Sequence, residues 1–170
     1  MFRMSAPRIA VLAILFTAAG ISSGGSPTTR IVPARGEKIT FKKVYSSDRL
    51  KNYTLQKVTK TSFTLKNTKG LLTATWDGTF RNVATDEKQD LSATGICKAH
   101  SSRKIECTFD ASAGTVNVTA QPNQEVIVSI PMAQGVQFSR EADGIVHSEI
   151  LFGFGEDEEF NNTFRMNKVR

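Results

Sequence analysis

The feature that most constrains this fold is a series of short strand-forming runs in a chain that lacks helical periodicity. From residue 31 onward, no long segment has an apolar residue at every third or fourth position, which is the spacing of an amphipathic helix. Runs rich in Thr, Val, Ile and Phe recur instead, with turn residues between them. The pattern predicts strands near 38–45, 53–58, 62–66, 71–76, 79–84, 91–99, 104–109, 114–120, 125–130 and 145–152, with weaker candidates near 30–34, 135–139 and 162–168.

Strands separated by turns roughly every eight to twelve residues are typical of β-sandwiches and β-barrels. We therefore expect a single all-β domain, folded as an antiparallel β-sandwich, with a small closed β-barrel as the alternative. The 170 residues, 39% of them hydrophobic, are enough for one domain with a substantial core. Only 2 cysteines are present, which excludes a disulfide-dense miniature scaffold.

The first residues have the order of a secretory signal peptide. Two arginines precede an unbroken apolar run at 9–16, and small residues follow it. The run is shorter than the roughly 20 apolar residues that cross a bilayer, and an uncleaved N-terminal helix is the alternative. We expect a secreted or periplasmic protein with no transmembrane segment once the signal peptide is removed. Its predicted parts are a signal peptide at 1–22, a flexible linker at 23–29 and the all-β domain at 30–170.

Two turns between the early strands can be predicted from residue type. Asn67–Gly70 would close a four-residue hairpin, with Phe63 opposite Ala74. Asp77–Gly78 is a strong hairpin signal, because a type I′ turn needs positive φ at both central residues. Residues 85–90 are too polar for a buried strand and predict a loop or one turn of helix.

The 2 cysteines of the chain, Cys97 and Cys107, predict a disulfide across a hairpin. A three-residue loop at 101–103 sets the register, and strand alternation then places both thiols on an apolar face. The same register gives Gly95 an aromatic neighbour, which a glycine in a strand benefits from. The predicted pairs are Cys97 with Cys107, Lys98 with Glu106, His100 with Lys104, and Gly95 with Phe109.

Positive charge is concentrated early in the predicted domain. Residues 30–69 carry eleven Lys or Arg against one Glu and one Asp, whereas the net charge of the whole chain is only +6. A positive face of this kind favours an anionic glycan, a lipid head group or an acidic protein surface as the partner. Nucleic acid is not expected, because no aromatic-plus-basic stacking pattern is present. A solvated sheet face is the alternative. The candidate anion-binding residues are Lys42, Arg49, Lys51, Lys57 and Lys60.

Catalytic signals are sparse. His147 and Glu149 lie two residues apart on a predicted strand, so they share a face and are candidates for a general base or for metal ligands. An exposed polar pair is the alternative, because no third ligand or nucleophile is identifiable. The acidic run at 156–159 lacks the ligand spacing of a calcium loop. We therefore predict no metal and no cofactor.

These patterns favour an exported binding or structural module over an enzyme, with the basic region contacting an anionic surface. Two hypotheses from other classes remain open. A lipocalin-like barrel would carry a small apolar ligand among the 11 Phe and the single Trp. An extracytoplasmic hydrolase would use His147 and Glu149.

Overall fold

The computed structural model describes residues 29–110, 114–131, 134–142, 144–152 and 163–169. These residues form ten strands and one short helix, which confirms the predicted all-β class. The predicted signal peptide at 1–22, nearly all of the linker at 23–29 and the acidic run at 156–159 lie outside them. The elements are β1 (Lys38–Val44), α1 (Ser47–Asn52), β2 (Val58–Thr68), β3 (Leu71–Arg81), β4 (Lys88–Ser101), β5 (Lys104–Phe109), β6 (Thr115–Ala120), β7 (Glu125–Ser129), β8 (Gly135–Ala142), β9 (Ile145–Phe152) and β10 (Thr163–Lys168).

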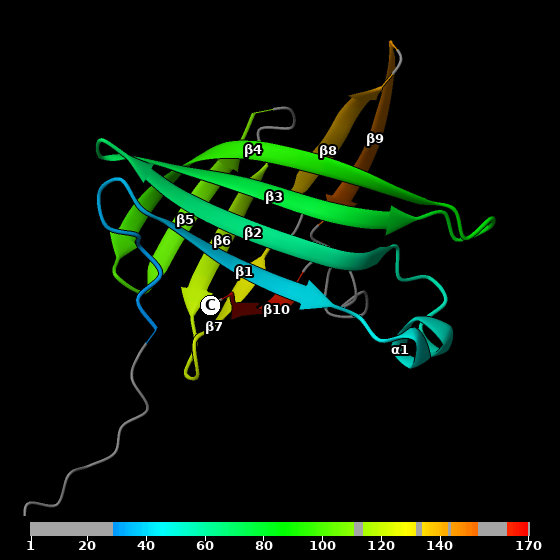
Figure 1. Ribbon diagram of the computed structural model, residues 1–170, viewed down its shortest axis with the longest axis horizontal. Helices are drawn as coiled ribbons and strands as arrows, with labels where there is room; N and C mark the ends of the chain where they lie inside the picture. Colours follow the sequence, from blue (N-terminus) through cyan, green and yellow to red (C-terminus); the bar gives the residue numbers. More distant parts are fainter. Residues whose placement is uncertain (1–28, 111–113, 132–133, 143, 153–162, 170) are drawn as a thin grey trace, which may run out of the picture.

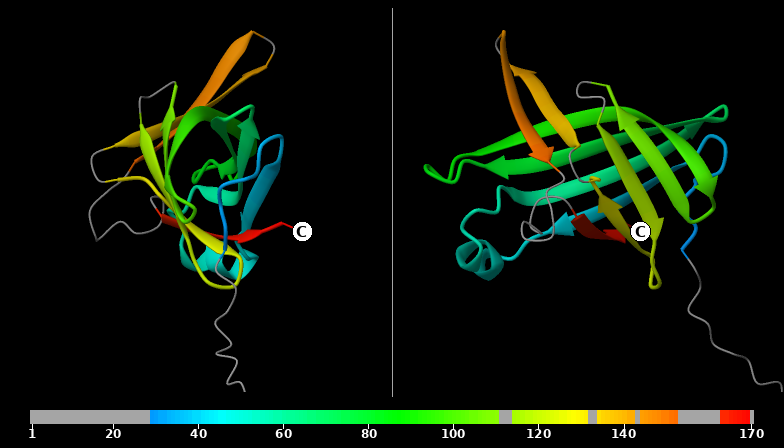
Figure 2. Two further views of the ribbon diagram at one scale, coloured as in Figure 1. Left: turned by 90° about the vertical axis from the view of Figure 1, so that its left-hand side faces the viewer. Right: turned by 180° about the vertical axis from the view of Figure 1, so that it is seen from behind.

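Eight of the strands close into an antiparallel barrel (Figures 1 and 2). Strands β1 to β7 follow one another around it, and β10 completes the ring by pairing with both β7 and β1. Of the two architectures expected from the sequence, the structure therefore has the closed barrel. The remaining strands, β8 and β9, form a hairpin that projects from the wall and joins β4 through the pair Ser92–Ser139 (Figure 1).

Aromatic side chains fill the barrel interior. Trp76 lies at the centre, with its ring centroid 5.1 Å from that of Phe138 and 5.2 Å from that of Phe164. Phe63 and Phe109 also contact the indole, at centroid distances of 5.7 and 6.1 Å. All five residues are buried. Because Phe138 comes from β8, the projecting hairpin is anchored in the same core as the ring of eight strands.

The chain reverses between β2 and β3 through a two-residue turn at Lys69 and Gly70. Their φ angles are 52° and 98°, the positive values that a type I′ turn requires. Leu65 therefore pairs with Ala74, so the predicted register, with a four-residue turn, is wrong by two residues. Because a shift of two preserves alternation, the predicted inward face is still correct.

The turn predicted at Asp77–Gly78 does not exist, because both residues lie inside β3. Gly78 is needed there for packing: a Cβ at this position would lie 2.5 Å from Cε2 of Phe80. The phenyl ring covers the glycine, as aromatic residues often do for glycines in strands. The strands predicted at 71–76 and 79–84 are consequently one continuous strand, which ends at Arg81.

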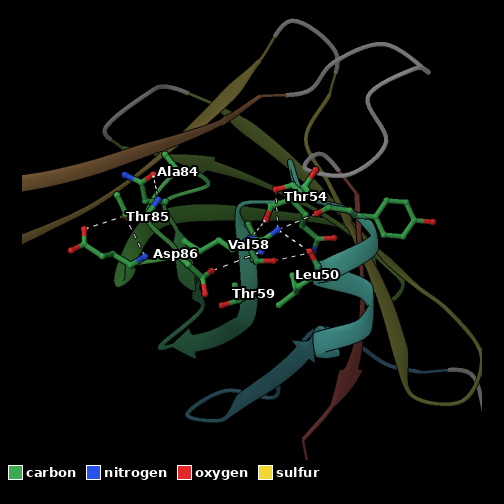
Figure 3. Close-up of polar contacts among 12 residues, drawn as sticks. Leu50, Thr54, Val58, Thr59, Ala84, Thr85 and Asp86 are labelled. Atoms are coloured by element: carbon green, nitrogen blue, oxygen red, sulfur yellow. Dashed lines mark hydrogen bonds and ion pairs between the residues drawn. The ribbon is translucent and has the colours of Figure 1, made fainter.

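The strand predicted at 53–58 is also wrong, because α1 and a loop precede β2 there. Ser46 caps α1 by accepting a hydrogen bond of 3.2 Å from the backbone N–H of Arg49. Beyond the helix, the nearly buried Arg81 side chain holds the loop. Its Nη2 donates to the carbonyl oxygens of Leu50 and Thr54 at 3.1 and 3.0 Å (Figure 3). A helix of six residues is too short to produce a periodic signal in the sequence.

The disulfide hairpin of β4 and β5 matches the prediction. Cys97 and Cys107 are bonded inside the barrel, with their Cα atoms 4.0 Å apart, and Gly95 pairs with Phe109. Only the tip differs, because a register shift after Ala99 pairs Ser101 with Lys104 and leaves His100 out. Glu106 is the strand-register partner of Lys98, and its carboxylate lies 3.9 Å from Nε2 of His100.

Candidate functional site

A groove of about 340 Å³ opens on the outer wall of the barrel, where the β8–β9 hairpin joins β4. Its floor is a row of outward side chains that the strand registers place side by side. Ser62 on β2 pairs with Asp77 on β3, Asp77 pairs with Ser92 on β4, and Ser92 pairs with Ser139 on β8. Because three of the four side chains are small serines, the wall is recessed here. We call this feature the wall groove.

Hydroxyl groups orient both carboxylates of the wall groove. Asp77 accepts a hydrogen bond of 3.2 Å from Oγ of Ser62 at one oxygen and one of 3.0 Å from Oγ of Ser92 at the other. Two residues further along the strands, Oγ1 of Thr79 donates to Oδ1 of Asp90 at 2.5 Å. An ionised carboxylate accepts about four hydrogen bonds in total. Each therefore retains capacity for donors from a ligand.

Three cations border the wall groove. Lys42 on β1 lies across from Ser62, Lys60 lies two residues before Ser62 on β2, and Arg140 follows Ser139 on β8. All three side chains are exposed. Among the described residues, the ion pairs within 4.0 Å that involve Lys or Arg are those of Lys57, Arg81 and Arg165. Lys42, Lys60 and Arg140 thus have no ion-pair partner within 4.0 Å in the described part of the chain.

The structure brings together only two of the five predicted anion-binding residues, Lys42 and Lys60. Lys51 is exposed on α1, away from the wall groove. Nζ of Lys57 forms an ion pair of 3.0 Å with Oε2 of Glu149. The guanidinium of Arg49 stacks between two phenol rings, as described next.

The guanidinium of Arg49 contacts the rings of both tyrosines of the chain. Its guanidinium carbon lies 5.2 Å from the ring centroid of Tyr45 and 4.9 Å from that of Tyr53, which are cation–π distances. Burial raises the pKa of the Tyr45 hydroxyl, and the positive charge of Arg49 partly opposes this effect. Arg49 therefore connects α1 to the end of β1 and is only partly available to an external anion.

His147 and Glu149 do lie on one face of β9, as the sequence predicts, but they have different neighbours. Glu149 contacts Lys57 on the loop before β2. His147 pairs across the hairpin with Arg140, and both line a second groove of about 480 Å³ beside the loop that connects β3 and β4. Within the described part of the chain, no three His, Cys, Asp or Glu side chains are grouped closely enough to hold a metal ion.

Sequence reasoning missed most of the wall groove. Arg140 and the serines carry no motif, and Asp77 was assigned to a turn. The one available signal was strand alternation, which continues through Gly78 with Trp76 and Phe80 both inward. Following that alternation would have placed Asp77 on the outer wall.

Comparisons with known proteins give no independent guide, because no protein family, curated protein or solved structure matches the chain. None of the described helical residues forms a helix long and apolar enough to cross a membrane.

Proposed function

We propose that this protein is an exported, non-catalytic binding module that holds an acidic glycan in the wall groove. The observation that carries the proposal is the pair Lys42 and Lys60. They are two exposed cations on neighbouring strands, without an ion-pair partner among the described residues, and they lie beside a floor of hydroxyls and carboxylates.

The mixture of groups in the wall groove favours one ligand class. The two lysines and Arg140 attract an anionic group. Asp77 and Asp90 repel a simple inorganic anion but accept hydrogen bonds from ligand hydroxyls. A polysaccharide that carries both carboxylate or sulfate groups and free hydroxyls satisfies both requirements.

Export is supported by the disulfide Cys97–Cys107. Bonds of this kind persist in oxidising compartments and are rare in the cytosol. Acidic polysaccharides are encountered on extracytoplasmic surfaces, so the proposed export is consistent with the proposed glycan ligand.

The packed interior favours the outer wall over the inside of the barrel as the binding site. A small apolar ligand inside would have to displace rings that already contact Trp76. Tryptophan fluorescence separates the two cases, because an interior ligand would quench the emission of Trp76, whereas a glycan in the wall groove leaves it nearly unchanged.

The proposal is tested by titrating heparin-like oligosaccharides into the protein by calorimetry. We expect Lys42→Ala/Lys60→Ala to weaken binding about tenfold, or about 0.7 kcal/mol for each exposed lysine. The matched control is Lys66→Ala/Lys69→Ala, which removes the same charge from exposed positions outside the wall groove. Equal losses in the two double variants would contradict a specific site.

Two further measurements sharpen the test. Binding should weaken steeply with salt, since exposed charges are screened over about 8 Å at physiological ionic strength. Asp77→Asn should also weaken glycan binding, although it makes the protein more positive, because the amide nitrogen cannot accept from ligand hydroxyls. Tighter binding by this variant, or retention that does not depend on salt, would overturn the proposal.

A further inference from the structure

β9 is the last strand of the sheet and, among the described strands, it pairs only with β8. The eight barrel strands have neighbours on both sides because the ring is closed. The hairpin, in contrast, projects away from the ring (Figures 1 and 2), and no other described strand lies along the outer edge of β9. An edge of this kind presents a row of N–H and C=O groups that can pair with another strand.

Nothing along β9 blocks such pairing. The strand is eight residues long, and its register with β8 runs without a bulge from Phe152 to Ile145. It contains neither Pro nor Lys, the residues that usually protect an edge. Three of its apolar side chains are exposed to solvent: Ile145 by 60%, Val146 by 66% and Ile150 by 42%.

The sequence of this edge is complementary to itself. From Ile145 to Leu151 it runs apolar, apolar, His, Ser, Glu, apolar, apolar. In an antiparallel pair of two copies centred on Ser148, His147 of one copy lies opposite Glu149 of the other. Val146 lies opposite Ile150 in the same arrangement. Polar residues therefore face polar residues, and apolar residues face apolar residues, throughout this register.

Neighbouring registers do not share this match. Centring the pair on His147 places two imidazoles opposite each other and Ile145 opposite Glu149. Centring it on Glu149 places two carboxylates opposite each other, which is unfavourable. A two-fold interface requires a surface that fits its own copy, and only the Ser148 register meets this requirement.

We propose that β9 pairs antiparallel with β9 of a second copy of this chain, with Ser148 at the two-fold axis. The two hairpins then form one continuous sheet between two barrels. The ion pair between Lys57 and Glu149 within each copy helps to hold the glutamate in place. Among the residues that line the wall groove, none comes from β9, so this inference does not depend on the glycan proposal.

The test is covalent trapping of the predicted register. Ser148→Cys introduces a single free thiol, because Cys97 and Cys107 are bonded to each other. Mild oxidation should convert this variant to a covalent dimer that has lost the free thiol. The matched control is Glu141→Cys, an exposed position on β8 of the same hairpin, away from the axis. After the same oxidation, it should run as a monomer on a denaturing, non-reducing gel.

Sedimentation of the disulfide-intact protein provides the second measurement. The wild type should sediment at twice the monomer mass, and Val146→Lys should sediment as a monomer at the same concentration. Thr119→Lys, which adds the same charge to an exposed position on β6 of the closed barrel, should remain a dimer. A wild type that is monomeric at all concentrations would overturn the proposal, as would a dimer that Ser148→Cys fails to trap. Glycan titration of Val146→Lys keeps the two proposals distinguishable, because we expect it to match the wild type.

Discussion

Nε1 of Trp76 donates a hydrogen bond of 2.7 Å to Oγ1 of Thr61 inside the barrel. The same hydroxyl donates a bond of 3.0 Å to the backbone carbonyl of Asp77, whose side chain lies in the wall groove. One buried threonine on β2 thus satisfies the polar atom of the largest core side chain and fixes the strand that carries the floor of the groove.

We predict that Thr61→Val lowers the free energy of unfolding by about 1–3 kcal/mol. Valine keeps the shape of threonine but leaves the indole N–H without an acceptor. Thr61→Ser keeps the hydroxyl and should recover part of the loss. Urea denaturation followed by Trp76 fluorescence measures both variants, and a valine variant as stable as the wild type would show that the hydrogen bond contributes nothing.

Gly95 should tolerate no side chain. An added Cβ would clash with the backbone oxygen of Thr108 on β5, an atom that cannot move without distorting the disulfide hairpin. Gly95→Ala should therefore lower stability by at least about 1–3 kcal/mol. Thr94→Ala, at the exposed neighbouring position, is the control and should change the midpoint little. Equal midpoints for the two variants would contradict this explanation.

Arg81 should determine the order of α1 and the loop after it. Its Nε donates to the carbonyl oxygen of Gln56 at 2.8 Å, in addition to its bonds to Leu50 and Thr54. Arg81→Lys retains the charge but lacks the planar set of donors, so amide exchange in α1 should accelerate.

Hydrogen exchange read at the amides of Leu50 and Tyr53 tests this expectation. Arg165→Lys is the control, because Arg165 is exposed and its ion pair with Glu125 is 3.7 Å long. Exchange in α1 should be unchanged in the control, and an equally unchanged Arg81→Lys variant would assign the order of the helix to other contacts.

Tyr45 should make the fold sensitive to alkali. Burial raises the pKa of its hydroxyl above the ordinary value of 10.0 in the folded state. As the pH rises, the unfolded chain therefore loses this proton first, around the ordinary value of 10.0. The stability that the buried hydroxyl contributes is fully present below that value and is lost as the pH rises from it toward the folded pKa. Tyr45→Phe should show a smaller decrease between about pH 9 and about pH 11.

Absorbance of the phenolate provides a direct check, because the chain contains only 2 tyrosines. In Tyr53→Phe, Tyr45 is the only remaining phenol, and the midpoint of its ionisation should lie above pH 10.0 in the folded protein. A midpoint at or below the ordinary value would contradict the assignment.

Local rules predicted local structure well. The disulfide hairpin was correct because alternation, turn length and the apolar face all required the same register of Cys97 and Cys107. The turn predicted at Asp77–Gly78 was wrong because an Asp-Gly pair looks the same in sequence whether it forms a turn or lies in a strand. Here the glycine makes room for Phe80. Arg81 is an ordinary arginine in sequence, and its role appears only when α1 folds back onto β3.

The sequence did not predict which strands far apart in the chain pair with each other. Whether short antiparallel strands form a sandwich or a barrel depends on contacts such as Phe41 with Lys168, between residues far apart in the chain. The wall groove has the same origin, since Lys42, Ser62, Asp77, Ser92 and Ser139 come from five strands. Composition identified the two lysines, but only the register shows what lies beside them.

The position of β10 has a consequence for biosynthesis. The seven strands before the projecting hairpin leave β1 and β7 as open edges until Thr163–Lys168 arrives between them. A nascent polypeptide therefore cannot close its barrel until residues 163–168 have been synthesised. Until then, β1 and β7 have unpaired edges that must be kept from pairing with strands of neighbouring nascent chains.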